Sequence, residues 1–163
     1  MKATTLLERQ HRNLQQLCEA VERGSVSIRE SLLPQLAGDL VAHIAVEREL
    51  FYPAISTALH DEVWVVQGRA RHLQASDALD RALDSALEGE EFTAAIADLR
   101  ALVELHAEEE EEVLFPRVEQ ALEVAAMRDL ARRMMTLYHA KVEAGYVPDE
   151  GWAARSRRSS ARL

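Results

Sequence analysis

The sequence predicts an all-α protein: an antiparallel up-and-down four-helix bundle followed by a short fifth helix near the C-terminus. Apolar residues make up 48% of the 163-residue chain, and six glycines and four prolines interrupt them, as is typical of folded helical proteins. Apolar side chains recur at three- and four-residue intervals from about residue 4 to residue 144. We expect one domain over residues 1–145 and a basic, disordered tail over residues 146–163.

Glycine and serine residues mark the boundary between the first two predicted helices. The first helix carries an apolar stripe and ends near Gly24, since glycine is common at helix C-termini. A second helix is expected to follow, capped by Ser27 or Ser31. Pro34 is compatible with a helix only in its first turn, so we expect this helix to begin close to it.

Two further turns and a fifth helix complete the predicted bundle. A polar turn at His60-Asp61 precedes a third helix, which we expect to close near Gly89. The fourth helix runs from about Glu91, and the fifth covers residues 123–144. Short connections of this kind place successive helices side by side and antiparallel.

A short motif occurs twice in the sequence, 63 residues apart. In each copy a glutamate follows a histidine by four residues and a proline follows it by ten; the copies are His43, Glu47 and Pro53, and His106, Glu110 and Pro116. Residues four apart share one face of a helix, so each copy projects an imidazole and a carboxylate in the same direction. Each proline is expected to kink or end its helix.

Two more histidines, His11 and His72, lie on the predicted inward stripes of the first and third helices. The midpoint between His11 and His43 falls beside the first turn, and the midpoint between His72 and His106 is Gly89. Residues equidistant from a turn lie at the same height in an antiparallel bundle. The sequence therefore predicts one layer of four histidines, with the two glutamates about 6 Å along their helices.

Burying two carboxylates and four imidazoles is costly, because an uncompensated buried charge destabilises a fold by several kcal/mol or more. No lysine or arginine on these stripes offsets the glutamates, whereas divalent cations would. Any one of these histidines taken singly is more simply an ordinary core or surface residue. The repeated pattern as a whole predicts a metal site with the ligands His11, His43, Glu47, His72, His106 and Glu110.

The ligand types favour iron or manganese, because nitrogen and oxygen ligands without thiolates are unlike a structural zinc site of the cysteine type. If Glu47 and Glu110 both bridge, each of two ions receives two imidazoles and two carboxylate oxygens. A shared oxide or hydroxide then leaves a position open on each ion for dioxygen, peroxide or nitric oxide. Zinc and a single ion stay open as alternatives, since spacing does not select the element.

The pattern resembles the hemerythrin-like HHE cation-binding family over about residues 5–120. The resemblance rests on the two histidine–glutamate motifs, each followed by an aromatic residue and a proline, and on His11 and His72. It implies a four-helix bundle around an oxo- or hydroxo-bridged non-haem di-iron centre, in a protein that senses or responds to oxygen, peroxide or nitric oxide stress. It also leaves open a di-iron enzyme, which would consume peroxide or nitric oxide or repair iron–sulfur clusters, and a role in iron buffering.

The chain departs from classical oxygen-carrying hemerythrins at two places. Those proteins have a pair of histidines four residues apart on the third helix, but Gly68 and Ser76 stand four residues either side of His72. Their last carboxylate ligand is an aspartate five residues after its histidine, where Glu111 stands here, and Glu110 has the HHE spacing instead. Oxygen carriage of the classical kind is therefore not expected.

The remaining chemistry-bearing residues have plainer interpretations. His60 is expected to be a solvated loop residue, and His139 would add a ligand only if the fifth helix folded over the bundle. Cys18 is expected to be a buried, inert thiol. Tyr52 is expected to pack the end of the bundle, from where its hydroxyl could also donate a hydrogen bond to a metal centre.

Charge and composition restrict the partners and the compartment. A net charge of −9 argues against nucleic acid and against an anionic membrane surface, both of which attract clustered Lys and Arg. We see no apolar run of about 18 residues and no secretory signal, so no transmembrane segment is expected. A single cysteine fits a reducing cytoplasm. The expected partner is a small diatomic or peroxide ligand, and no protein partner is predicted.

Overall fold

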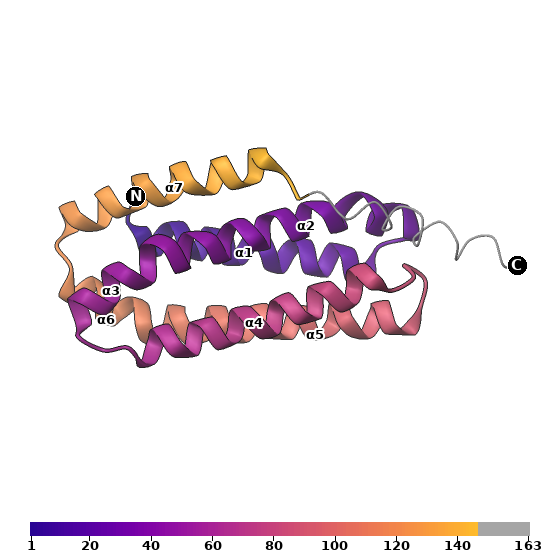
Figure 1. The fold of residues 1–163 in the computed structure, drawn as a ribbon, viewed down its shortest axis with the longest axis horizontal. Helices are drawn as coiled ribbons and strands as arrows, with labels where there is room; N and C mark the ends of the chain where they lie inside the picture. The colour runs from indigo at the N-terminus through magenta and orange to yellow at the C-terminus, as the bar shows by residue number, and fades with distance from the viewer. Residues whose placement is uncertain (147–163) are drawn as a thin grey trace, which may run out of the picture.

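The structure, a computed structural model, describes residues 1–146 (Figure 1). Every regular element in this part of the chain is helical; in order they are α1 (Ala3–Arg23), α2 (Val26–Val46), η1 (Glu47–Phe51), α3 (Tyr52–Leu59), α4 (Val63–Asp84), α5 (Glu90–Glu109), η2 (Glu110–Leu114), α6 (Phe115–Ala121) and α7 (Val124–Ala144). The elements η1 and η2 are single π-helical turns. Apart from Tyr146, the expected tail lies outside the described residues.

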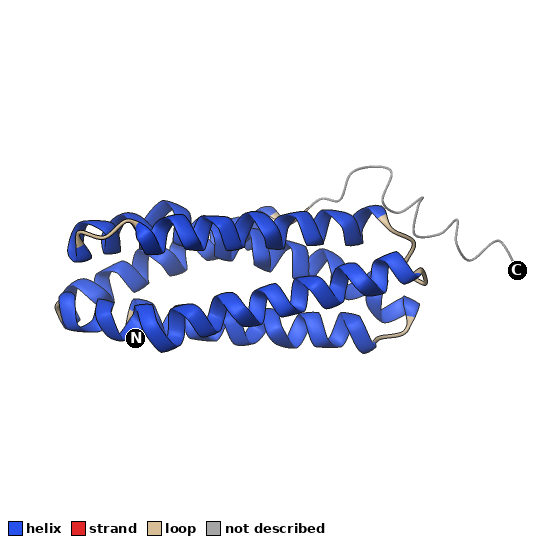
Figure 2. Ribbon diagram, turned by 90° about the horizontal axis from the view of Figure 1, so that it is seen from below, coloured by secondary structure: helices blue, strands red, loops and turns tan. Residues whose placement is uncertain are grey.

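The helices form an antiparallel up-and-down bundle, which confirms the predicted fold class (Figures 1 and 2). The pair α1 and α2 packs on the pair α4 and α5, while α3 and α6 continue α2 and α5 beyond their π turns. Helix α7 lies along the outside of α1 and α2. It has 21 residues, the same length as α1, although its sequence suggested a short helix. No helix among the described residues is long and apolar enough to cross a membrane.

The apolar core consists of two clusters separated by a polar layer. One cluster fills the end of the bundle near the α1–α2 and α4–α5 turns and includes Leu14, Leu40 and Val103. The other fills the opposite end, where Leu7 and Leu114 pack with residues of α3, α6 and α7. The four predicted histidines lie between the two clusters, so the core holds them in place from above and below.

The duplicated motif produces the same backbone twice. After Glu47 the α-helical hydrogen bonding gives way to a π turn, in which the Tyr52 N–H donates to the Glu47 carbonyl. After Glu110 the Phe115 N–H likewise donates to the Glu110 carbonyl. A proline follows in the first turn of the next α-helix, where its missing N–H and fixed φ are tolerated. The predicted kink is therefore a π turn, and the chain stays helical through it.

The start of α2 differs from the prediction. The N-cap position is Ser25, and Ser27 and Ser31 lie inside the helix. Pro34 lies well within α2 rather than in its first turn. Burial of Leu33 and the residues after Pro34 against the core outweighs the one helical hydrogen bond that the proline removes.

The other expected boundaries lie close to those observed. His60 ends α3 in the left-handed conformation with φ 51°, at the predicted turn. Helix α4 ends at Asp84, five residues before Gly89, and Gly89 occupies the N-cap position of α5. The fifth helix, Val124–Ala144, matches the predicted range.

Candidate metal centre

The structure brings all six predicted ligands together in one buried layer. Each of these residues is at most 7% exposed. The four histidines come from α1, α2, α4 and α5, and each glutamate is the first residue of η1 or η2. The six residues are His11, His43, Glu47, His72, His106 and Glu110. Centroids of neighbouring imidazole rings lie 4.9 to 6.0 Å apart. The equal distances from the turns thus predicted the layer correctly.

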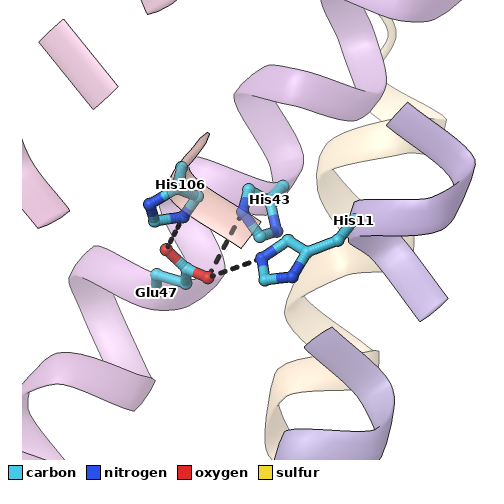
Figure 3. Close-up of side chains that lie close together, drawn as sticks. All are labelled: His11, His43, Glu47 and His106. Atoms are coloured by element: carbon cyan, nitrogen blue, oxygen red, sulfur yellow. Dashed lines mark ion pairs between the residues drawn. The ribbon is translucent and has the colours of Figure 1, made fainter. Parts of the chain in front are cut away.

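Glu47 lies at the middle of the layer, with two imidazoles facing each of its oxygens. Glu47 Oε1 is 3.2 Å from His43 Nε2 and 3.7 Å from His11 Nε2. Glu47 Oε2 is 2.8 Å from His72 Nε2 and 3.3 Å from His106 Nε2. Figure 3 shows three of these imidazoles directed at the carboxylate. The two oxygens therefore divide the four histidines into two pairs.

Glu110 joins the same two pairs from the opposite helix. Its Oε2 atom lies 3.6 Å from His11 Nε2 and 3.8 Å from His106 Nε2, one histidine from each pair. His11, His43, Glu47 and His106 together offer ligand atoms that all lie within 4.8 Å of one another. Both carboxylates thus lie close to histidines of both pairs.

The donor atoms in the layer are suited to binding metal. The Nε2 atoms of all four histidines, Glu47 Oε1 and Glu110 Oε2 are buried and have no hydrogen-bond partner. Polar atoms buried in this way cost free energy unless something binds them. The nitrogen–oxygen separations between the imidazoles and the two carboxylates, 2.8 to 3.8 Å, resemble the roughly 3 Å between adjacent ligands of one ion with bonds of about 2.1 Å.

Two outer contacts orient the imidazoles on the α1–α2 side. His43 Nδ1 lies 3.0 Å from Gln10 Oε1, and His11 Nδ1 lies 2.9 Å from Glu111 Oε1. An Nδ1–H donated to these oxygens leaves Nε2 unprotonated and aimed into the layer, as a metal ligand requires. Burial lowers the pKa of His11, but the hydrogen bond to Glu111 and the charges of the two central carboxylates outweigh it and raise the pKa to about 9.

Gln10 and Glu111 are functional residues that the sequence reasoning did not assign. Glu111 was noted only as the residue at the aspartate position of classical hemerythrins, and Gln10 was not singled out. Each of them is adjacent in sequence to a predicted ligand, Gln10 to His11 and Glu111 to Glu110. This adjacency was the sequence feature that could have identified them as partners of the ligand imidazoles.

The two carboxylates differ in their protonation. Burial and the charge of Glu47 together raise the pKa of Glu110 to about 8. Burial also acts to raise the pKa of Glu47, but the charges of His43 and His106 outweigh it and hold that pKa well below its usual range. The layer therefore holds a proton that a bound cation would displace.

Tyr52 contacts both carboxylates. Its hydroxyl lies 2.9 Å from Glu47 Oε2 and 3.0 Å from Glu110 Oε1, and its ring stacks on His72 at a centroid distance of 5.7 Å. Phe115 occupies the equivalent position of the second motif and stacks on His11 at 6.0 Å. The tyrosine hydroxyl thus lies within hydrogen-bonding distance of both carboxylates, and it makes the two halves of the layer unequal.

The other candidate residues lie away from the layer. His60 and His139 are exposed, and His139 contacts the ring of Tyr138 on α7. In the run of five glutamates from 108 to 112, only Glu110 is buried. Cys18 is fully buried in the apolar core, as expected.

Two small cavities border the layer, each of about 10 Å³. One is lined by all four histidines together with Arg71 and apolar residues. The other lies between α4 and α5 and is lined by His106, Glu110 and Trp64 among others. Each volume holds at most one molecule the size of water, so the centre has room only for a very small ligand.

Comparison with known proteins agrees with this geometry. The sequence profile of the Hemerythrin HHE cation binding domain matches residues 2–118, a span that contains all six residues of the layer. The chain belongs to the hemerythrin HHE cation-binding family.

The solved structure of another HHE domain-containing protein has the same fold as this chain. The crystal structure of a hemerythrin HHE cation-binding domain-containing protein from Mycobacterium kansasii is similar, with a TM-score of 0.77 and 21% sequence identity. The match covers 98% of this chain and 96% of that one. Among curated proteins no significant match was found. This chain is therefore a member of a cation-binding family, and its buried cluster of histidines and glutamates is suited to binding a metal.

Proposed function

We propose that this HHE domain binds two iron ions through His11, His43, Glu47, His72, His106 and Glu110, and uses them to bind dioxygen, peroxide or nitric oxide in a sensing or stress response. The observation that carries the proposal is the division of the four imidazoles into two pairs by the oxygens of Glu47. A single ion needs no such division, whereas two bridged ions do.

The donor set supports iron. Each ion would receive two imidazole nitrogens and up to two carboxylate oxygens, a mixture that suits iron or manganese better than a closed thiolate zinc site. When bound, a pair of iron ions supplies redox chemistry and open coordination positions for a small ligand. The protein contributes a dry site that excludes larger molecules, because the adjoining cavities are each about 10 Å³.

Tyr52 favours a second candidate function, the consumption of peroxide or nitric oxide by a di-iron enzyme. Its hydroxyl lies within 3.0 Å of both carboxylates, so its proton lies close to any ligand held between them. Burial and the two carboxylates raise the Tyr52 pKa well above its usual range, which keeps the proton on the phenol. A retained proton can stabilise a bound ligand by hydrogen bonding or be delivered to it.

The metal content of protein purified without chelator tests the proposal, with visible spectra recorded before and after dithionite and again after air. We expect about two irons per chain, two being the number of ions the carboxylates can bridge, and an oxo-bridge absorption that bleaches on reduction. His72→Ala should lower the iron content and remove that absorption, while His60→Ala should leave both unchanged. One zinc per chain, or iron binding that His72→Ala does not alter, would contradict the proposal.

The amount of peroxide or nitric oxide consumed per chain separates the two candidate functions. A binder or sensor returns to its starting spectrum on removal of the ligand without net turnover. An enzyme consumes peroxide, or nitric oxide when an electron donor is supplied, in amounts exceeding the protein. Tyr52→Phe should slow such turnover selectively if the phenol delivers the proton.

A further inference from the structure

One side of the centre lies nearer to solvent than the other. The side chains of His72 on α4 and His106 on α5 are 9% and 8% exposed. Those of His11 on α1 and His43 on α2 are each 1% exposed. The shortest way from solvent to the layer therefore passes between α4 and α5.

The fifth helix covers the opposite side. Helix α7 packs on α1 and α2 and buries the apolar side chains of Met127, Leu130, Ala131 and Met134 against them. These side chains belong to the core cluster that contains Leu7, immediately below the layer. A small molecule approaching from this side would have to pass through two packed layers of helix.

One of the two cavities lies along the α4–α5 seam. The cavity beside Glu110 is lined entirely by residues of α4, α5 and η2, including Gln67 and Glu109. The other lies inside the bundle, where residues of α1, α2, α4 and α5 line it, and Arg71 is among them. Both cavities border His106, so the seam cavity and the central cavity adjoin the same histidine of the layer.

An ion pair closes this seam. Arg71 Nη2 lies 2.6 Å from Glu109 Oε1 and Arg71 Nε lies 3.0 Å from Glu109 Oε2, a two-point contact between α4 and α5. Gln67 and Gln74 extend it along the seam, by hydrogen bonds to Glu109 and Arg71 respectively. The two charged side chains are 25% and 22% exposed, so they lie at the boundary between the cavities and solvent.

We propose that the Arg71–Glu109 ion pair is the gate through which metal ions and small ligands reach the centre. The inference rests on the proposed function, since it concerns access to the same site. The pair lies beside His72 and Glu110 in sequence, and its side chains line the two cavities without belonging to the six candidate ligands. Rotation of the Arg71 side chain into solvent would open the seam and leave the helices in place. The gate governs rates of access, and the affinity of the centre is set by the six buried residues.

Cobalt(II) uptake by the metal-free protein is the first test, followed by the visible absorbance of the ion. Arg71→Ala and Glu109→Gln each break the pair, and we expect both to take up cobalt about fivefold faster, since a partly exposed ion pair holds the closed state by at most about that factor. The first variant removes a positive charge and the second a negative one, so an effect of charge alone would change the two rates in opposite directions.

A matched control exists on the same two helices. Arg81 of α4 and Asp98 of α5 form an ion pair at 2.9 Å, remote from the layer. Arg81→Ala and Asp98→Asn should take up cobalt at the rate of the unaltered protein. Acceleration in these variants equal to that in the gate variants would overturn the proposal, because loosening the helix pair anywhere would then suffice.

Nitric oxide, a neutral probe, gives the second test on iron-loaded protein by stopped-flow. The association and dissociation rates should both rise about fivefold in Arg71→Ala, with an unchanged dissociation constant, since breaking one exposed ion pair alters only the barrier. Unchanged rates in both gate variants of a protein that loads iron normally would overturn the gate alone. A protein that takes up neither cobalt nor iron would overturn the proposed function, and the gate with it.

Discussion

The hydroxyl of Tyr52 reaches the two central carboxylates because residue 68 is a glycine. A Cβ atom at Gly68 would lie 2.5 Å from Tyr52 Cζ and closer still to the hydroxyl. Gly68 precedes His72 by four residues on the same face of α4. In the other half of the bundle, Leu7 precedes His11 by the same interval, and the ring there is Phe115. The two halves of the centre therefore differ at two matched pairs of positions, the helix residue and the aromatic ring that faces it.

Gly68→Ala should destabilise the fold by about 1–3 kcal/mol, because the new methyl group overpacks the buried phenol. Gly38→Ala is the matched control: Gly38 also lies within a helix, and among residues 1–146 its added Cβ would meet only Tyr146, at 3.7 Å. That variant should be neutral or more stable by up to about 1 kcal/mol, from helix propensity. Urea denaturation measures both. Equal changes in the free energy of unfolding would show that the Tyr52 contact is relaxed without cost.

Tyr52→Phe should lower the stability of the metal-free protein by about 1–3 kcal/mol, because buried carboxylate oxygens lose a hydrogen-bond partner. Tyr138→Phe serves as the control, since it removes a hydroxyl bonded to Asp39, which keeps its 2.7 Å hydrogen bond from Asn13. The control should cost less, and its iron spectrum should equal that of the unaltered protein. A spectrum of Tyr52→Phe that is also unchanged would mean that the phenol does not influence the bound metals.

The stability of the metal-free protein should fall as pH rises from about 6.5 to about 8. The lower limit of this window is the ordinary histidine pKa, and the upper limit is the raised pKa of Glu110. Burial and the charge of Glu47 raise the pKa of Glu110 to about 8, and the neighbouring carboxylates raise that of His11 to about 9 despite its burial. The folded chain then binds protons more tightly than the unfolded chain, so unfolding becomes easier as they leave.

Metal loading should reverse this trend, because bound ligands are already deprotonated. The difference in Tm between loaded and metal-free protein should therefore widen between pH 6.5 and pH 8, a window taken from the same pKa values. Differential scanning calorimetry at constant ionic strength provides the measurement. A difference that narrows with pH would show that the layer does not lose protons on binding metal.

Cys18 should be unreactive in the folded protein. Burial raises the pKa of its thiol to about 12, and its side chain is inaccessible in the core. A disulfide reagent at pH 8 should modify less than about one chain in ten over an hour, because thiolate is the reactive form. In guanidinium chloride the same reagent should modify one thiol per chain. Rapid modification under native conditions would indicate that the α1 core opens readily.

Much of the candidate site was predictable from residue spacing. His43 and Glu47 share a helix face by their four-residue interval, and the position of Gly89 places His72 level with His106. These relationships depend on helix geometry and on the positions of turns, both of which are properties of local sequence. The same residues also carried the resemblance to the HHE family, and the profile match confirmed that the chain belongs to it.

The contacts that orient the layer were not predictable in this way. Gln10 contacts His43 across the α1–α2 interface, and Glu111 contacts His11 although the two residues are 100 positions apart in the sequence. Both lie on positions that read as polar and unremarkable along the chain. Pro34 was misplaced for a related reason, since local propensity predicts a helix start there while burial of the surrounding leucines favours a continuous helix.

Local sequence was thus sufficient for the fold class, the histidine layer and, apart from the start of α2, the helix boundaries within a few residues, because helical periodicity and turn residues act over short intervals. Side-chain partners depend on which helices meet and at what rotation, and packing of segments far apart in sequence sets both. The division of four imidazoles by Glu47, the contact of Tyr52 with Gly68 and the Arg71–Glu109 pair all arise at this level. They exist only once α1, α2, α4 and α5 have packed around the layer.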